Sequence, residues 1–304
     1  MPDYTANSYS AMPPSEGIRA HVELSRISGF IVCETFRVAP RKQPVHGSTA
    51  MDTALTMLQS WQARLPVSLQ MPVDLSHIDP SCCILHMQHN QLVILTTRPV
   101  FFSAVKKAVA QRVVRSQSPT EQHPQRILVR LCATTAHRNL ILAERITQSD
   151  RKLLQAGLHF LFNATVILLL NRIVSLPNLA VSHDMEMGQT RSITTTDEQL
   201  ESSIHFATQT FQNEAKTGTG YPRDCFRVLQ DLKSLTDRYI TSQHSIMNQK
   251  NLTDGTYAPL STAGDFPLGL STAQSQLGGT DNVYEEMMTW VQSDGSRLHD
   301  SLFI

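Results

Sequence analysis

The chain contains one long uncharged run, and this run limits the folds that it can adopt. Residues 153–170, LLQAGLHFLFNATVILLL, include no charged side chain over 18 positions, which is the lower limit of length for a membrane-spanning helix. Gln155, His159 and Asn163 recur every four residues, so a helix places them on one face. Such a polar face is unfavourable in lipid but is easily hydrogen-bonded between helices. We therefore predict a buried core helix and no membrane association, with a membrane span as the less favoured alternative.

Apolar residues follow helical spacing along much of the remaining chain. They recur three, four and seven positions apart in residues 17–38, 51–65, 80–98, 127–146, 200–211 and 228–239. No stretch alternates apolar and polar residues with a period of two, as a half-buried β-strand would. The sequence therefore predicts an all-α fold, an irregular multi-helix bundle with essentially no β-sheet.

Composition divides the chain into three regions. Residues 1–16 are polar and lack the apolar core of a signal peptide, so we predict a flexible N-terminus. Residues 17–241 contain the predicted helices and form one helical domain. Residues 242–304 are rich in Ser, Thr, Gly and Pro with few apolar anchors, so we predict a mostly disordered tail. A short amphipathic helix is expected within this tail, near residues 281–292.

The predicted helix at residues 51–65 carries an apolar stripe that includes Trp61. Ser48 or Thr49 can cap its start, because either hydroxyl can accept a hydrogen bond from a free backbone N–H. Pro66 ends it, since the residue before a proline is disfavoured in the helical conformation. We expect Trp61 to be buried on the stripe.

The next predicted helix begins at Pro80 and must end or kink near Arg98, because Pro99 follows. Arg98 is then expected to cap the last carbonyl groups, a position that the helix dipole favours for a cation. The polar residues between these two positions are interpreted as partners in hydrogen bonds between helices.

Metal binding and catalysis are not indicated. His86 and His89 lie three residues apart and Cys82 lies one turn earlier, but no further ligand follows on that face. The side chains of the loop HDMEMG, residues 183–188, are expected to be solvated. Dinucleotide, phosphate-loop, nucleophile-elbow and HExxH motifs are absent. We therefore predict no enzyme, no catalytic, cofactor-binding or metal residue, and no cofactor.

The cysteines are few and widely spaced. No CxxC pair occurs, so neither a zinc knuckle nor a disulfide framework is indicated, and a reducing intracellular compartment is expected. The five residues are Cys33, Cys82, Cys83, Cys132 and Cys225.

The charge balance argues against DNA binding by the chain alone. The 26 basic residues match the 26 acidic ones, so no net field attracts nucleic acid or an anionic membrane. The densest basic stretches are residues 37–42 and 106–115, and the second is the one plausible strip for phosphate contacts. A solvated helix face is the favoured interpretation of that strip. We expect no sequence-specific DNA binding, since specificity needs side chains on base edges.

Five short motifs, in order, resemble one family over residues 17–239. LHMQHNQLVILTTRPVFF at residues 85–102 resembles the signature segment of the fungal-specific transcription factor regulatory domain, the middle homology region of fungal binuclear zinc-cluster activators. LQSWQARLPVSL at residues 58–69 resembles the family pattern L-x-x-W-x-x-x-L-P. Weaker similarities occur at residues 24–32, 131–140 and 161–170. The matching signature positions are Trp61, Leu65, Pro66, Leu85, His86, Asn90, Arg98 and Pro99.

The resemblance implies a transcriptional regulator of the fungal zinc-cluster type in the nucleus, acting on a metabolic or secondary-metabolite gene cluster. It also implies protein partners, either a second copy in a homodimer or a full-length relative. Family members usually begin with six cysteines that bind two zinc ions, and this chain lacks that block. We therefore expect an N-terminally truncated regulatory domain, with zinc only where such a block precedes Met1, and the resemblance assigns DNA binding to no residue.

Two alternatives remain open from the sequence. One is a regulator without its own DNA reader, which works by pairing with a full-length relative. The other is a helical small-molecule binding module, or an enzyme of a biosynthetic pathway, that reuses the same scaffold.

Overall fold

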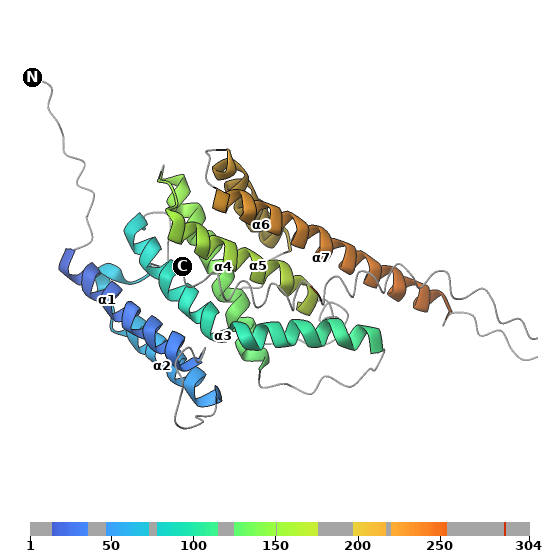
Figure 1. The fold of residues 1–304 in the computed structure, drawn as a ribbon, viewed down its shortest axis with the longest axis horizontal. Coiled ribbons are helices and arrows are strands. Elements are labelled where there is room, and N and C mark those ends of the chain that lie inside the picture. Colours follow the sequence, from blue (N-terminus) through green and yellow to red (C-terminus); the bar gives the residue numbers. More distant parts are fainter. Residues whose placement is uncertain are drawn as a thin grey trace, which may run out of the picture. The chain divides into compact units, whose positions relative to one another are not determined.

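The computed structural model of the protein describes residues 14–35, 47–72, 78–114, 125–149, 151–175, 197–216, 220–253 and 289. Helices account for nearly all of these residues, and no strand occurs among them, which confirms the predicted all-α fold (Figure 1). The elements are α1 (Pro14–Phe30), the π-helical turn η1 (Ile31–Thr35), α2 (Gly47–Ala63), the 3-10 turn η2 (Val67–Leu69), α3 (Pro80–Val114), α4 (Arg126–Gln148), α5 (Gln155–Ser175), α6 (Asp197–Ala215) and α7 (Gly220–Thr253).

The chain divides into two compact units. The first comprises residues 1–101, 119–168 and 189–229, and the second comprises residues 102–118, 169–188 and 230–304. Helices α3, α5 and α7 each contribute residues to both units. The signature positions taken from the family all belong to the first unit.

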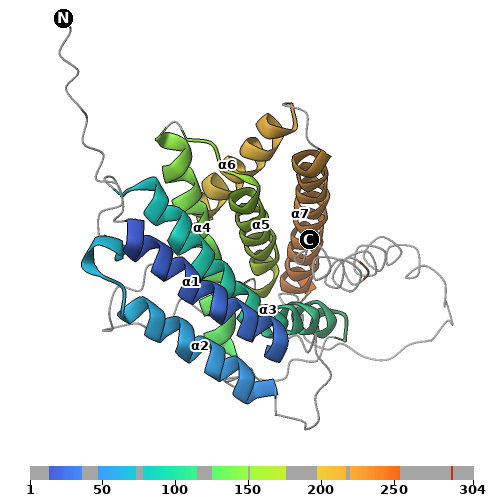
Figure 2. The ribbon, with the colours of Figure 1, turned by 60° about the vertical axis from the view of Figure 1, so that its left-hand side comes forward.

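The first unit begins with an antiparallel pair, α1 and α2, which lie side by side against the N-terminal part of α3 (Figure 2). The inward face of α1 carries small and branched residues at helical spacing, among them Ala20, Leu24 and Ile27, and these are buried. Trp61 of α2 is only 1% exposed, and its Nε1–H donates to the carbonyl of Ala20 over 3.2 Å. The predicted burial of Trp61 is confirmed.

The ends of α2 differ from the prediction. The helix begins at Gly47, so Ser48 and Thr49 lie inside its first turn and not at a capping position. It ends at Ala63, two residues before the predicted end. Pro66 lies directly before η2. At this position the missing backbone N–H of proline removes no hydrogen bond of the turn.

Helix α3 does not end at Arg98, so that part of the expectation is wrong, while the alternative of a kink at this position stays a prediction. The helix continues to Val114 with Pro99 inside it. A proline in a helix interior removes one hydrogen bond and costs about 3 kcal/mol or more. Phe101 and Phe102, which follow directly, are buried, and each such side chain contributes about 1.5–3 kcal/mol. Their burial offsets the loss, and the boundary between the two units falls between them.

Helix α5 is the uncharged run that the sequence predicts to be a core helix. Among the described residues, it is the one helix that is long and apolar enough to cross a membrane, and 72% of the relevant window is buried inside the fold. Its buried side chains include Leu161, Ile167 and Leu170. This burial fits a helix of the protein core.

The second unit contains a small ionic cluster between α5 and α7. Arg172 NH1 lies 2.6 Å from Asp237 Oδ1, and Lys233 Nζ lies 3.1 Å from Asp237 Oδ2. Partial burial by itself raises the pKa of Asp237, but the hydrogen bonds from Arg172 and Lys233 outweigh it and hold this pKa below its usual value. The carboxylate is therefore ionised at neutral pH and joins the two helices.

Helix α7 extends beyond the predicted boundary at residue 241. It runs from Gly220 to Thr253. Helix α1 likewise begins at Pro14, inside the region predicted to be flexible. The predicted loop at residues 183–188 and the predicted tail beyond residue 253, with its short helix near 281–292, lie outside the described residues, apart from residue 289.

Replacing Trp61 with alanine should destabilise the protein by about 3–5 kcal/mol, because a large buried side chain would leave a cavity between α1, α2 and α3. Urea unfolding followed by circular dichroism measures the change. Trp61→Phe provides the control: it keeps a ring in the same space and loses only the bond to Ala20, so its cost should be clearly smaller. Equal stability of Trp61→Ala and the wild type would contradict the packing of α2.

Candidate functional site

Residues of two separate signature motifs meet where α3 packs against α2. The His89 ring stacks on the Trp61 indole, with ring centroids 5.1 Å apart and planes 15° apart. The His86 ring meets the same indole by its edge, with a centroid distance of 6.4 Å and an angle of 69°. We call these three side chains the aromatic cluster. Stacked and edge-on pairs of this kind add stability beyond the apolar area that they bury.

The two histidines of the aromatic cluster also bind backbone carbonyl groups. His86 Nε2 lies 2.8 Å from the carbonyl oxygen of Leu69, and His89 Nε2 lies 3.3 Å from that of Leu58. Because a carbonyl oxygen only accepts, each Nε2 carries the proton and donates. The first bond ties α3 to η2 and the second ties it to α2.

Burial keeps these histidines neutral. It lowers the pKa of His86, against the opposing effect of the bond to Leu69. It lowers the pKa of His89 to about 4, although Asn90 and the carbonyl of Leu58 act in the opposite direction. Neither ring is therefore charged at neutral pH, which agrees with their role as single-proton donors to the backbone.

The side chains of His86, His89 and Cys82 are engaged with backbone carbonyl groups. The Nε2 atoms of the two histidines donate to two different carbonyl groups, and the Cys82 Sγ lies 3.5 Å from the carbonyl oxygen of Leu69. Within the described part of the chain, no group of three His, Cys, Asp or Glu residues is placed to hold a metal ion. The loop at residues 183–188 lies outside that part.

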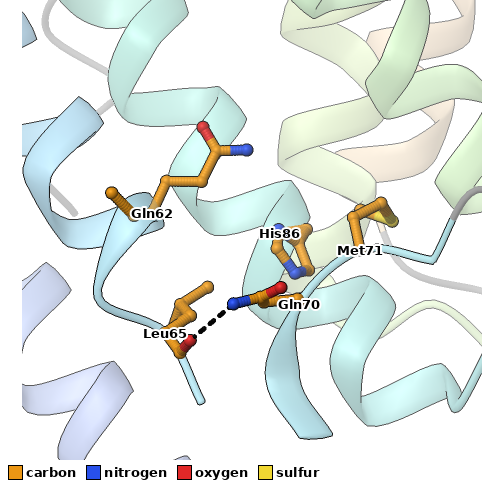
Figure 3. Close-up of a pocket in the computed structure, with 6 residues that line it drawn as sticks. Gln62, Leu65, Gln70, Met71 and His86 are labelled. Carbon is orange, nitrogen blue, oxygen red and sulfur yellow. Dashed lines mark hydrogen bonds between the residues drawn. The ribbon is translucent and has the colours of Figure 1, made fainter. Parts of the chain in front are cut away.

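A pocket of about 280 Å³ opens beside the aromatic cluster (Figure 3). In Figure 3, His86 is seen between Gln62 and Met71, with Gln70 next to it. The Gln70 amide Nε2 donates to the carbonyl of Leu65 over 2.9 Å. Two carboxamides, a neutral imidazole and a thioether offer donors and acceptors without a net charge. The lining residues are Gln62, Ala63, Leu65, Gln70, Met71 and His86.

Arg98 lies inside α3, near Cys132 of α4, and not at the end of its own helix as predicted. It is 9% exposed, and burial lowers the pKa of its guanidinium to about 10, so the group remains protonated at neutral pH. Burial raises the pKa of the neighbouring Cys132 thiol to about 12, against the opposing effects of a hydrogen bond with Thr97 and of the Arg98 charge. A positive charge is therefore held inside the first unit next to an uncharged thiol.

A second polar group joins α5 to the start of α7. Asn163 Nδ2 lies 2.9 Å from His159 Nε2, and His159 Nδ1 lies 3.1 Å from the Tyr221 hydroxyl. The amide donates to Nε2, so the ring proton resides on Nδ1 and points to Tyr221. Burial, and secondly the charge of Arg98, lowers the pKa of His159. Gln155, predicted to share this face, is exposed and takes no part.

The buried thiols are poor nucleophiles. Burial raises the pKa of Cys82 and Cys225 to about 11 and that of Cys83 to about 12. The thiolate is the reactive form of cysteine, so these side chains are inert at neutral pH. Cys33 is exposed, and all five cysteines are free.

The structure brings together some of the signature residues and separates others. Trp61 and His86 belong to the aromatic cluster, and Leu65 lines the pocket beside it. Arg98 and Pro99 lie more than two helical turns further along α3 and face other neighbours. Leu85 and Asn90 are buried. The sequence motifs did not reveal Gln62, Gln70 and Met71 as lining residues, because three separate elements contribute to the pocket.

Acid should destabilise the fold through His89. Its pKa lies near 6.5 in the unfolded chain and near 4 in the folded chain, so the contribution is fully present above pH 6.5 and is lost as the pH falls toward 4. A shift of this size corresponds to roughly 3 kcal/mol. His89→Gln should flatten this part of the curve of urea midpoint against pH. The same change at His205, an exposed residue of α6, should leave the slope as in the wild type; an unchanged slope in His89→Gln would refute this assignment.

Comparison with known proteins gives no relative for this chain. No protein-family model, no curated protein and no solved structure matches it. The resemblance to the fungal regulatory domain therefore rests on the residues of the motifs alone. Functional conclusions have to be argued from the same residues.

Proposed function

We propose that the chain is a regulatory domain of the fungal zinc-cluster type, which acts in the nucleus through contacts with other proteins. The aromatic cluster carries this proposal. Trp61 and His86 come from two motifs of the resemblance that are separated along the chain, and their rings meet in the core. This contact is what a shared packing role of the two motifs would produce.

The chemistry of the core supports a role without catalysis. A reactive group needs a free functional atom and a pKa near the working pH. The Nε2 atoms of His86 and His89 are held by carbonyl groups, and burial raises the pKa of the Cys132 thiol to about 12. These side chains suit a scaffold whose outer surface makes the functional contacts.

The proposed targets are genes of metabolism, including a secondary-metabolite cluster. Recruitment to such genes is proposed to occur through a partner, either a second copy or a full-length relative that carries the zinc cluster. The balance of 26 basic and 26 acidic residues supports recruitment by protein contacts over an electrostatic attraction to DNA.

A reporter assay tests the proposed function. The chain is fused to an unrelated DNA-binding module in a fungal cell, with a reporter gene behind the matching operator. We expect reporter output to rise or fall relative to the module alone. The Trp61→Ala fusion, matched for protein level, should lose the effect because the fold is destabilised. Unchanged output from an abundant wild-type fusion would refute the proposal.

Small-molecule binding is a second candidate, favoured by the pocket beside His86. Its volume of about 280 Å³ is at the lower end of the range for ligand pockets. Because the lining side chains are uncharged amides, an imidazole and a thioether, the pocket fits a small neutral ligand with both donors and acceptors. Such a ligand would bridge α2, η2 and α3.

Thermal unfolding in the presence of small neutral amides and lactams tests the second candidate. A ligand at about 100 times its Kd should stabilise the fold by about 2.7 kcal/mol. Ala63→Met fills the pocket without removing a polar group and should abolish the shift. Gln59→Met, an exposed change on α2 outside the pocket, should keep it. Equal shifts in both variants would exclude the pocket as the binding site.

A further inference from the structure

The outer face of α4 carries a line of arginines. Arg126, Arg138 and Arg145 are exposed, and Arg130 lies on the same side. At 100° per residue, the four positions fall within a sector of about 120°, and they span about 28 Å of the helix. We call this surface the arginine face. The opposite side of α4 is buried and consists of Cys132, Thr135, Ala136, Asn139, Leu140, Leu142, Ala143 and Ile146.

Helix stability does not account for the arginines at the start of α4, whereas Arg145 lies in the last turn, where the helix dipole favours a cation. Arg126 is the first residue of α4, and Arg130 follows one turn later. Cations at this end face the positive end of the helix dipole, which disfavours them. No acidic residue occurs in the first turn, and Gln125 makes no side-chain capping bond. Residues that oppose a local preference are expected where a surface serves binding.

The neighbouring groups on α4 neutralise this charge only in part. Glu144 is the one acidic residue of the helix, and its carboxylate lies 3.4 Å from the amide of Gln148. Arg145 NH1 donates to the neutral oxygen of the same Gln148 over 2.9 Å. Arg130 has an interaction of its own within the chain. The inference therefore depends on Arg126, Arg138 and Arg145.

Apolar side chains share this face with the arginines. Ile127 is 76% exposed, and Ile141 is partly exposed in the same sector. A surface that mixes guanidinium groups with isoleucines matches a partner that presents carboxylates and apolar side chains together. Phosphate groups of duplex DNA would use the charges but not the isoleucines, and the chain has a formal net charge of zero.

We propose that the arginine face binds an acidic amphipathic helix of a partner protein. Carboxylates spaced by about three and about two helical turns would pair with Arg126, Arg138 and Arg145, because guanidinium and carboxylate groups form paired hydrogen bonds. Apolar residues between them would cover Ile127 and Ile141. The inference names the partner class of the proposed regulatory function and in that sense rests on it.

Fluorescence anisotropy with a synthetic peptide tests the inference without any reporter. The probe is a labelled helical peptide about 28 Å long, matching the face, with glutamates four residues apart and leucines between them. A peptide of the same composition with the glutamates spread around the helix is the first control, and a labelled DNA duplex is the second. The amphipathic peptide should bind most tightly, and its affinity should fall as salt is added.

Charge-reversal variants locate the binding surface. Arg138→Glu with Arg145→Glu should weaken binding of the amphipathic peptide by about tenfold or more. Lys106→Glu with Lys107→Glu changes the net charge equally on exposed residues of α3 and should have little effect. The pair Arg138→Gln and Arg145→Gln should show an intermediate loss. Circular dichroism establishes that each variant is folded.

Three outcomes would overturn the inference. The first is that the peptide does not bind. The second is that the lysine variant and the arginine variant weaken peptide binding equally. The third is that the DNA duplex binds more tightly than the peptide, through the same arginines. The last result would assign the face to nucleic acid. A reporter that responds while the peptide does not bind would refute this inference and leave the proposed function intact. Peptide binding together with an unchanged reporter would support this inference and refute the proposed function.

Discussion

The contact between Trp61 and two histidines holds the first unit together. The indole donates to α1 at the carbonyl of Ala20, stacks on His89 and meets the edge of His86. The histidines in turn donate to carbonyl groups in α2 and η2. A buried polar atom without a partner costs free energy, so the arrangement that gives the indole N–H and both Nε2–H groups an acceptor is favoured. The aromatic cluster thereby fixes how α1, α2 and α3 lie against one another.

The same burial that gives this cluster its stability removes its reactivity. Imidazoles that donate to carbonyl groups and remain neutral cannot exchange protons near pH 7, and thiols kept protonated do not attack substrates. Even the charged Arg98 lies next to the uncharged Cys132 inside the unit. Function in such a scaffold is expected at its surface, where the pocket beside His86 and the outer face of α4 offer polar groups that the core does not use.

Helical periodicity was sufficient to predict most of the elements. It gave α4 and α6 to within a few residues, because their buried and exposed positions separate cleanly. A helix end before Pro99 did not occur, because the proline rule is local and ignores the burial of Phe101 and Phe102. Periodicity also placed the end of α7 too early. Apolar residues become sparse toward the end of this helix, so the helical pattern can no longer be recognised in the sequence. The stacking of His89 on Trp61 could not be predicted, because it depends on how two helices cross.

The arginine face shows why charge density along the sequence is a poor guide to a helical surface. Residues 106–115 are identified from the sequence as a basic strip because their basic residues are close together in the chain. The four arginines of α4 are separated by intervals of four, eight and seven residues, so no short segment of the sequence contains more than two of them. These intervals are close to whole turns of a helix with 3.6 residues per turn, and the side chains become neighbours only after folding. A search for anionic partners should therefore follow the helical projection of a chain and not its linear density of charge.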